Sequence, residues 1–199
     1  MAVLSKSRPG AGDRRREAEQ GLLAATGALL NEGSSYAELS VEQIASRAGR
    51  PRTAFYLYFR DKRELLMRLT EEVAQTLYEE ADVWWSGSRG RDDVRPALAD
   101  ITRTWAEHAG VLGAVVEAAT YDEEISEFWR NVVGRFIEAT KRRLVEEGEE
   151  PGAAAAKAFV LCWMTAHVCY QQVARGKSAE DPTLLDALSE ILGRSVYGT

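Results

Sequence analysis

Apolar side chains recur at helical spacing along nearly the whole chain. Leu22, Leu23, Thr26, Leu29 and Leu30 form the first such stripe, which ends at a Gly-Ser-Ser run. Residues spaced three and four apart share one face of an α-helix, so these positions predict a helix with one buried side. No segment alternates apolar and polar residues long enough to predict a strand. The pattern predicts an all-α protein of about nine helices.

Two short helices follow the first one, separated by a tight turn. The patterns predict a helix over residues 41–47, a turn at Ala48-Gly49-Arg50, and a helix over residues 52–59. Ser40 with Gln43 is a capping box, a pairing typical of a helix start, and Asp61 with Glu64 is a second one that opens a long helix. Glycine suits a turn that requires positive φ. This spacing predicts a helix-turn-helix.

The second half of the chain predicts a larger helical lobe. One stripe runs from Val94 to Leu112, another from Ile125 to Leu144, and a last one from Leu184 to Val196. Between them, residues 153–173 are apolar nearly all round, which predicts a helix buried on every side. We therefore expect two domains: residues 1–62 form an N-terminal arm and helix-turn-helix domain, and residues 63–199 form a helical ligand-binding and dimerisation domain.

The charge is divided between these two parts. The chain carries a formal charge of −6, which by itself disfavours a polyanionic partner. Residues 1–62, however, hold ten basic and seven acidic side chains, a net +3, so the remainder carries −9. The positive part coincides with the predicted helix-turn-helix, which removes the objection to a nucleic-acid partner.

The chain lacks the residues that several classes of protein function require. Cys162 and Cys169 are seven residues apart on a predicted helix, too far to bridge each other, and read as small buried apolar residues. The two histidines, His108 and His167, fall on different helices, and no metal-ligand spacing, phosphate-binding glycine loop or nucleophile elbow is present. We expect no enzyme activity, no metal and no cofactor. The uncharged run 158–174 contains His167 and two glutamines and is shorter than a membrane span, and no signal peptide opens the chain, so the expected location is the cytoplasm.

The predicted recognition helix has the chemistry to read DNA. Arg52, Thr53, Tyr56 and Tyr58 offer hydrogen-bond donors, whereas Phe55 and Phe59 anchor the helix inward. An α-helix fits the major groove and reads base edges with such side chains. The less specific interpretation is that the tyrosines only pack against the module.

These segments closely resemble the TetR family of repressors. The resemblance rests on Leu39-Ser40-Val41-Glu42-Gln43-Ile44-Ala45-Ser46-Arg47-Ala48-Gly49, followed by Ala54-Phe55-Tyr56-Leu57-Tyr58-Phe59-Arg60-Asp61-Lys62-Arg63-Glu64-Leu65-Leu66. It covers about 45 residues. A looser similarity to the EthR-like branch lies in Trp105, Phe128-Trp129 and the terminal Ser195-Val196-Tyr197-Gly198.

The resemblance implies DNA-contact roles for seven residues. Ser40 would cap its helix and touch a phosphate, Lys62 would bind phosphate at the start of the fourth helix, and Arg50 would approach a groove or phosphate. The full set is Ser40, Arg50, Arg52, Thr53, Tyr56, Tyr58 and Lys62. Pro51 and Ala54 depart from the family, which often has Ser or Thr at the first position and Thr at the second. The resemblance therefore predicts DNA binding but says less about which operator sequence is bound.

The C-terminal lobe is rich in large aromatic residues, which either fill a core or surround a cavity. By the resemblance, a small lipophilic effector would lie among Trp105, Tyr121, Phe128, Trp129, Phe159, Trp163 and His167. The last two helices would pair two copies of the chain through Cys162, Cys169, Leu184, Leu188, Ile191 and Leu192. An intramolecular core is the alternative for those residues.

The sequence thus predicts a homodimeric repressor that binds a double-stranded palindromic operator and responds to a lipophilic ligand, with no membrane partner. The alternative is an architectural DNA-binding regulator without a ligand, which predicts a well-packed second lobe with no cavity.

Overall fold

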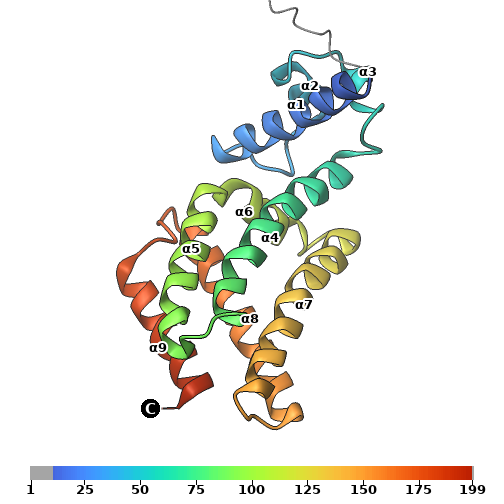
Figure 1. The fold of residues 1–199 in the computed structure, drawn as a ribbon. Helices are drawn as coiled ribbons and strands as arrows, with labels where there is room; N and C mark the ends of the chain where they lie inside the picture. Colours follow the sequence, from blue (N-terminus) through green and yellow to red (C-terminus); the bar gives the residue numbers. More distant parts are fainter. Residues whose placement is uncertain (1–10, 199) are drawn as a thin grey trace, which may run out of the picture. The chain divides into compact units, whose positions relative to one another are not determined.

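The computed structural model describes residues 11–198, and within them the chain forms nine α-helices, one short 3₁₀ helix and no strand (Figure 1). The all-α prediction is confirmed. The chain divides into two compact units, Met1–Leu65 and Leu66–Thr199. Helix α4 (Lys62–Trp85) begins in the first unit and continues into the second.

The first unit packs three helices around a small core. Helix α1 (Ala11–Asn31) buries one stripe, α2 (Val41–Arg47) contributes Ile44 and Ala45, and α3 (Arg52–Phe55) contributes Phe55. The Ser40–Gln43 capping box forms as predicted. Helix α3 is shorter than the predicted 52–59, because residues 56–58 continue as turns that still bury Phe59.

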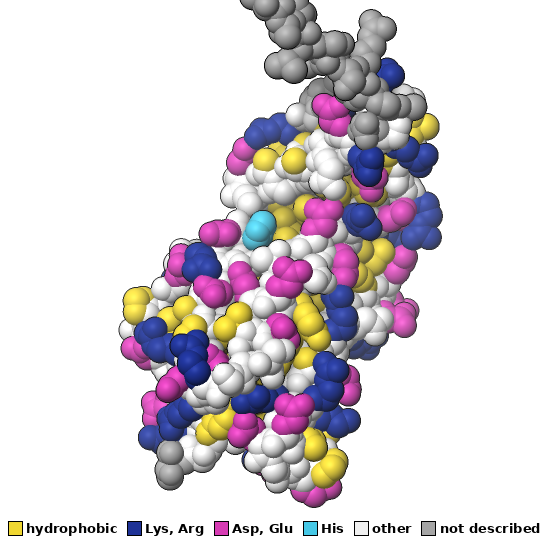
Figure 2. Space-filling model, viewed as in Figure 1, with side chains coloured by type: hydrophobic (Ala, Val, Ile, Leu, Met, Phe, Trp, Pro, Cys, Tyr) yellow, Lys and Arg dark blue, Asp and Glu magenta, His cyan; other side chains and the backbone are white. Residues whose placement is uncertain are grey.

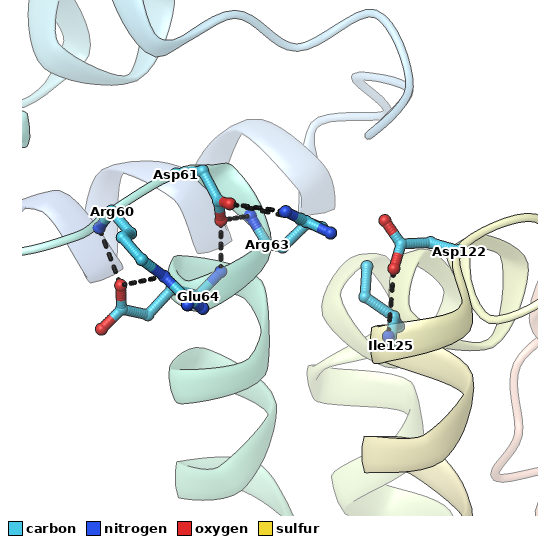
Figure 3. A network of polar contacts seen from close by, with 6 residues as sticks. All are labelled: Arg60, Asp61, Arg63, Glu64, Asp122 and Ile125. Carbon is cyan, nitrogen blue, oxygen red and sulfur yellow. Dashed lines mark hydrogen bonds and ion pairs between the residues drawn. The ribbon is translucent and has the colours of Figure 1, made fainter.

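The start of α4 is fixed by side chains around Asp61. Asp61 Oδ1 accepts hydrogen bonds from the backbone N–H groups of Arg63 (2.9 Å) and Glu64 (3.0 Å), which satisfies two of the free donors at the helix N-terminus (Figure 3). Glu64 Oε2 accepts from the backbone N–H of Arg60 at 2.7 Å. In a reciprocal capping box, the Glu64 side chain would accept from the backbone N–H of Asp61. It accepts from the backbone N–H of Arg60 instead, so only the Asp61 half of the predicted box forms.

The second unit is a layered helical bundle. Its elements are η1 (Gly90–Asp93), α5 (Val94–Glu107), α6 (Ala109–Ala118), α7 (Glu123–Glu146), α8 (Pro151–Ala174) and α9 (Pro182–Tyr197). Helix α7 packs along α8, and α5 packs along α9. The predicted stripe from Val94 to Leu112 is divided between α5 and α6, because the helix ends at His108 and a new one begins at Ala109.

Tyr197 ties the far end of this bundle together. Its hydroxyl oxygen accepts hydrogen bonds from Trp84 Nε1 (2.9 Å) and from an Arg143 guanidinium nitrogen (3.3 Å). These three residues belong to α9, α4 and α7. One half-buried phenol therefore joins three helix ends.

Helix α8 differs from its prediction. It was expected to be buried on every side, yet only 22% of its most apolar 18-residue window is buried. By length and composition alone the helix meets the criterion for a membrane span, whereas the uncharged run 158–174 within it is shorter than a span. On the face of the molecule in Figure 2, acidic and basic side chains are interspersed among apolar ones.

Candidate DNA-binding surface and ligand cavity

Helix α3 and the turn after it separate an anchored side from an exposed side. Phe55 and Phe59 are buried, with ring centroids 5.5 Å apart. Arg52, Thr53 and Tyr56 are exposed, and Tyr58 is half-buried. The burial of one side explains why the polar side chains of the short helix point together into solvent.

Two of these exposed groups are paired. Arg52 donates a hydrogen bond to the Tyr56 hydroxyl at 3.3 Å, and its guanidinium carbon lies 5.7 Å from the centre of the Tyr56 ring. The pair is one helical turn apart, so each side chain restricts the other's rotamers. Arg50 is exposed in the turn before the helix, after Gly49, whose φ of +66° is the left-handed conformation that glycine adopts readily.

Ser40 lies at the surface, and its side chain caps the N-terminus of α2. Its hydroxyl accepts from the Gln43 backbone N–H at 3.2 Å and donates to Gln43 Oε1 at 2.7 Å. The predicted capping role is thus formed. A phosphate contact from this residue would have to share the same hydroxyl.

Lys62 is engaged inside its own unit. Its ammonium donates to the backbone carbonyls of Tyr36 (2.9 Å), Ala37 (3.0 Å) and Leu39 (3.2 Å), and it lies 4.7 Å from the centre of the Tyr36 ring. An ammonium has three N–H donors, and all three are used. Burial also lowers the pKa of Lys62. These bonds give the side chain a structural role, since it joins the loop before α2 to the start of α4; its contact with a phosphate stays a prediction.

The second unit contains an apolar cavity between five helices. Its free volume is about 90 Å³, which is smaller than the roughly 300–1,000 Å³ usual for small-molecule sites, so a ligand of that size would require the surrounding helices to move apart. Its wall is formed by apolar residues of α4, α5, α7, α8 and α9, among them Leu77, Trp84, Trp85, Leu98, Ile101, Trp105, Trp129, Phe136, Leu161 and Leu192. Trp105 and Trp129 meet edge to face there, with ring centroids 6.5 Å apart.

A small polar cluster interrupts this apolar wall. Trp85 Nε1 donates to Thr140 Oγ1 at 3.1 Å, and Thr140 Oγ1 lies 3.5 Å from Cys162 Sγ. Thr165, the other threonine of the wall, donates its hydroxyl to the Leu161 carbonyl at 2.9 Å. Burial raises the pKa of Cys162 to about 11, against a smaller lowering by its contact with Thr140, so the thiol is neutral at physiological pH.

The structure brings together only part of the predicted ligand set. Trp105 and Trp129 line the cavity. Tyr121 is 58% exposed, Phe159 is 55% exposed and His167 is exposed, so these three point outward. Phe128 and Trp163 are half-buried and are not part of the wall. The cavity lies against one face of each helix: Trp129, Val132 and Phe136 on α7, and Leu161, Cys162 and Thr165 on α8. Phe128, Phe159 and Trp163 lie on other faces of these helices.

The predicted dimer set is similarly divided. Cys169, Leu188 and Leu192 are buried within the single chain, and Cys162 and Leu192 belong to the cavity wall. Leu184 is half-buried against the core, and Ile191 is 45% exposed. The intramolecular alternative therefore describes most of this set, and a different stripe of α8 reaches the surface.

Sequence reasoning missed several cavity residues. Trp84, Trp85, Phe136 and Thr140 were interpreted as parts of helix stripes or not singled out. The adjacent tryptophans at the end of a long helix were the available sign, because both are large apolar groups and both are buried in the core beside the cavity. Within residues 11–198, no group of three His, Cys, Asp or Glu side chains is placed to hold a metal ion.

Comparison with known proteins identifies relatives for both units. Residues 22–69 match the model for bacterial regulatory proteins of the tetR family, and residues 94–198 match the model for the C-terminal domain of the transcriptional regulator EthR. The HTH-type transcriptional regulator EthR of Mycobacterium tuberculosis is 27% identical over 207 residues, which cover 96% of this chain and 91% of the relative. Its namesake in Mycolicibacterium smegmatis is 27% identical over 150 residues, or 74% of this chain and 66% of the relative.

Solved structures share the same fold at lower identity. A TetR-like transcriptional regulator from Rhodococcus sp. RHA1 covers 96% of this chain and 97% of its own with a TM-score of 0.67 and 21% identity. The fatty acid degradation regulator FadR from Bacillus halodurans covers 94% and 97% with a TM-score of 0.73 and 14% identity.

A helix-turn-helix unit followed by a helical lobe, with family matches over both, defines a DNA-binding transcriptional regulator. The chain belongs to the TetR family, in its EthR-like branch.

Proposed function

We propose that this protein is a homodimeric repressor that binds a palindromic operator through its first unit, and that a small lipophilic ligand in its second unit modulates this binding. The observation that carries the ligand part is the apolar cavity between α4, α5, α7, α8 and α9. The alternative, an architectural regulator without a ligand, predicts a lobe filled by its own side chains.

The DNA-binding part of the proposal rests on the exposed side of α3 and its flanking turn. Arg52 and Thr53 are exposed on a helix anchored by Phe55, Arg50 is exposed in the turn before it, and Tyr56 and Tyr58 follow in the turn after it. Arginine reads guanine or phosphate, and threonine and tyrosine donate to either. We also place Ser40 and Lys62 at this surface as phosphate contacts, because each lies at a helix N-terminus.

The dimer part rests on the outer stripe of α8. Phe159 and Val160 are 55% and 59% exposed and lie on a helix otherwise apolar enough for a protein interior. An exposed apolar stripe of this kind favours a protein partner. A second copy fits best, because a two-fold pair of helix-turn-helix units would match two half-sites of a palindrome. We place Ile191 of α9 at the same interface. Regulators of this kind act in the cytoplasm, where we propose that this one is located.

The test of DNA binding is fluorescence anisotropy with a duplex from the region upstream of the protein's own gene and a shuffled duplex of equal length. Preference for the upstream duplex, with affinity falling steeply as salt rises, is the expected result. Arg50→Ala and Arg52→Ala should weaken binding, and Arg95→Ala, an exposed arginine of the second unit paired with Asp186, is the matched control. Equal binding to both duplexes would favour the architectural alternative.

A further inference from the structure

We propose that Leu57 reads a thymine in each half-site of the operator, by packing its side chain against the C5 methyl group of that base in the major groove. This inference rests on the proposed operator binding and adds a base preference to it. Leu57 lies beside the polar donors of the DNA-binding surface and offers no hydrogen bond of its own, so its contribution is apolar.

The side chain of Leu57 is exposed to an unusual degree. It is 69% exposed, and no other large apolar side chain whose exposure the structure describes reaches that value. The next residue toward α3, Tyr56, is 50% exposed. Single apolar side chains on a surface are common. This one, however, belongs to the turn that directly follows α3, and it therefore continues the surface on which operator binding depends.

The backbone after α3 determines where Leu57 points. The N–H of Leu57 donates to the carbonyl of Ala54 at 3.2 Å, and the N–H of Phe59 donates to the carbonyl of Phe55 at 3.0 Å. The winding of α3 therefore continues through the turn, which places Leu57 one turn after Thr53 and Ala54 on the same side. Phe55 and Phe59 are buried, so the core holds this turn in place while Leu57 itself stays free to contact a partner.

Two neighbouring rows of side chains result. The pair of Arg52 and Tyr56 forms a polar row, held by the hydrogen bond of 3.3 Å between them. Thr53 and Leu57 form the second row, which combines one hydroxyl with methyl groups. Among the four bases, thymine alone carries an apolar group on its major-groove edge, where its methyl lies beside the O4 acceptor. The second row therefore complements thymine better than any other base.

The size of the effect follows from the area removed from water. Burial of one methyl group contributes about 4-fold in affinity, which corresponds to roughly 0.8 kcal/mol. A two-fold pair of half-sites contains two such contacts, so the expected total is about 16-fold. Cytosine at the same place would set its polar N4 amino group against Leu57 and leave that donor without water or an acceptor, which disfavours it further.

The experiment compares the full-length protein on the upstream duplex with thymine and on the same duplex with deoxyuridine, which removes only the methyl group. In fluorescence anisotropy we expect the wild-type protein to bind the deoxyuridine duplex about 4- to 16-fold more weakly. Substitution of one thymine at a time should confine the loss to one position in each half-site. 5-Bromodeoxyuridine at that position, which restores an apolar group of similar size, should restore the affinity.

Four variants assign the loss to its residue. Leu57→Ala should weaken binding of the thymine duplex and should bind both duplexes within about 2-fold of each other, because the contact is then absent from both. Leu57→Met keeps an apolar side chain and should keep the penalty for deoxyuridine. Thr53→Ser removes the neighbouring methyl and should keep it as well. Val83→Ala, at a 45% exposed position of the second unit, should behave as the wild type.

The outcomes separate this inference from the proposed function. Equal affinity of the wild-type protein for both duplexes would overturn the thymine contact, as would a full penalty in Leu57→Ala or its loss in Thr53→Ser. If Leu57→Ala weakened both duplexes by the same factor, Leu57 would contact the sugars or the backbone and would not read the base. In each of these cases operator binding itself would stand. If the wild-type protein did not distinguish the upstream duplex from the shuffled one, the operator-binding function would fail, and the thymine contact with it.

Discussion

At the scale of single residues, Lys62 has a structural role in addition to the phosphate contact that the resemblance implies. A lysine at the start of a helix is a reasonable phosphate ligand. Here the three carbonyls that it binds belong to residues 36–39, in a loop about 25 positions earlier in the chain. Nothing in the local pattern around Lys62 foretells where that loop passes.

Replacing Lys62 by methionine tests the structural role. Methionine keeps an apolar stem but leaves three carbonyls without their donor, so the free energy of unfolding should fall by about 1–3 kcal/mol. Urea denaturation followed by circular dichroism measures the change. Arg50→Met is the control, since an exposed side chain should alter stability by roughly 0.5 kcal/mol or less. An unchanged urea midpoint for Lys62→Met would contradict the structural role.

Glu80 offers a pH-dependent prediction at the same scale. Burial raises the pKa of Glu80, and nearby Asp100 and Glu107 add to the rise against the opposing effects of Thr104 and Arg103. One carboxylate oxygen accepts from Thr104 at 2.6 Å, and the other is buried without a hydrogen-bond partner. A carboxyl whose folded-state pKa is raised contributes its full stability below the unfolded value of 4.5 and loses it as pH rises through the folded value.

Glu80→Gln should therefore raise the melting temperature at pH 7 and give no gain at pH 4. The amide cannot ionise and can still accept from Thr104, so the rise at neutral pH should be about 2 °C. Differential scanning calorimetry between pH 4 and pH 8 measures it. Glu79→Gln, one position away and exposed, should show no such pH-dependent difference. A gain that is equal at both pH values would contradict the assignment.

At the scale of elements, prediction from sequence succeeded where helical spacing separates an apolar face from a polar one. The α2 boundaries and its capping box follow from Ser40, Gln43 and Gly49, and Phe55 and Phe59 are buried as their spacing predicts. Helix α8 is different, because it is apolar on nearly every side and its pattern cannot tell one face from another. The sequence therefore does not show that Cys162 lines the cavity, nor that Phe159 is exposed on the outer stripe.

The outer stripe of α8 can be tested by a single charge. Val160→Glu places a carboxylate in the proposed interface, where it would lose its hydration on dimerisation, so the dimer dissociation constant should rise by at least about 100-fold. Light scattering coupled to size exclusion measures the change. Val83→Glu, at a 45% exposed position of α4, is the control and should leave the dimer intact. A Val160→Glu protein that remains dimeric would place the interface elsewhere.

At the scale of the whole molecule, the cavity is the feature that sequence reasoning reached least well. Its wall takes side chains from five helices, spread from Leu77 to Leu192. The sequence of each helix predicts which of its faces is buried. The cavity, however, exists where the side chains of those faces leave space between the helices, and this depends on how the whole bundle is assembled. One helix takes part in both units: α4 begins at Lys62 in the first and carries Leu77, Ala81, Trp84 and Trp85 to the cavity.

If ligand and DNA are coupled through this continuous helix, the coupling must be equal in both directions. A ligand that lowers operator affinity by a given factor must itself bind the operator complex more weakly by that same factor, typically about 5- to 150-fold. With 2-octanone as a small lipophilic probe, anisotropy titrations of the upstream duplex at saturating probe give one factor, and calorimetry of 2-octanone with and without bound duplex gives the other. Trp105→Phe, a change within the cavity wall, should alter both factors together and leave DNA affinity without ligand unchanged. A factor of one in both titrations would mean that the cavity and the operator surface act independently, and the architectural alternative would then describe this regulator better.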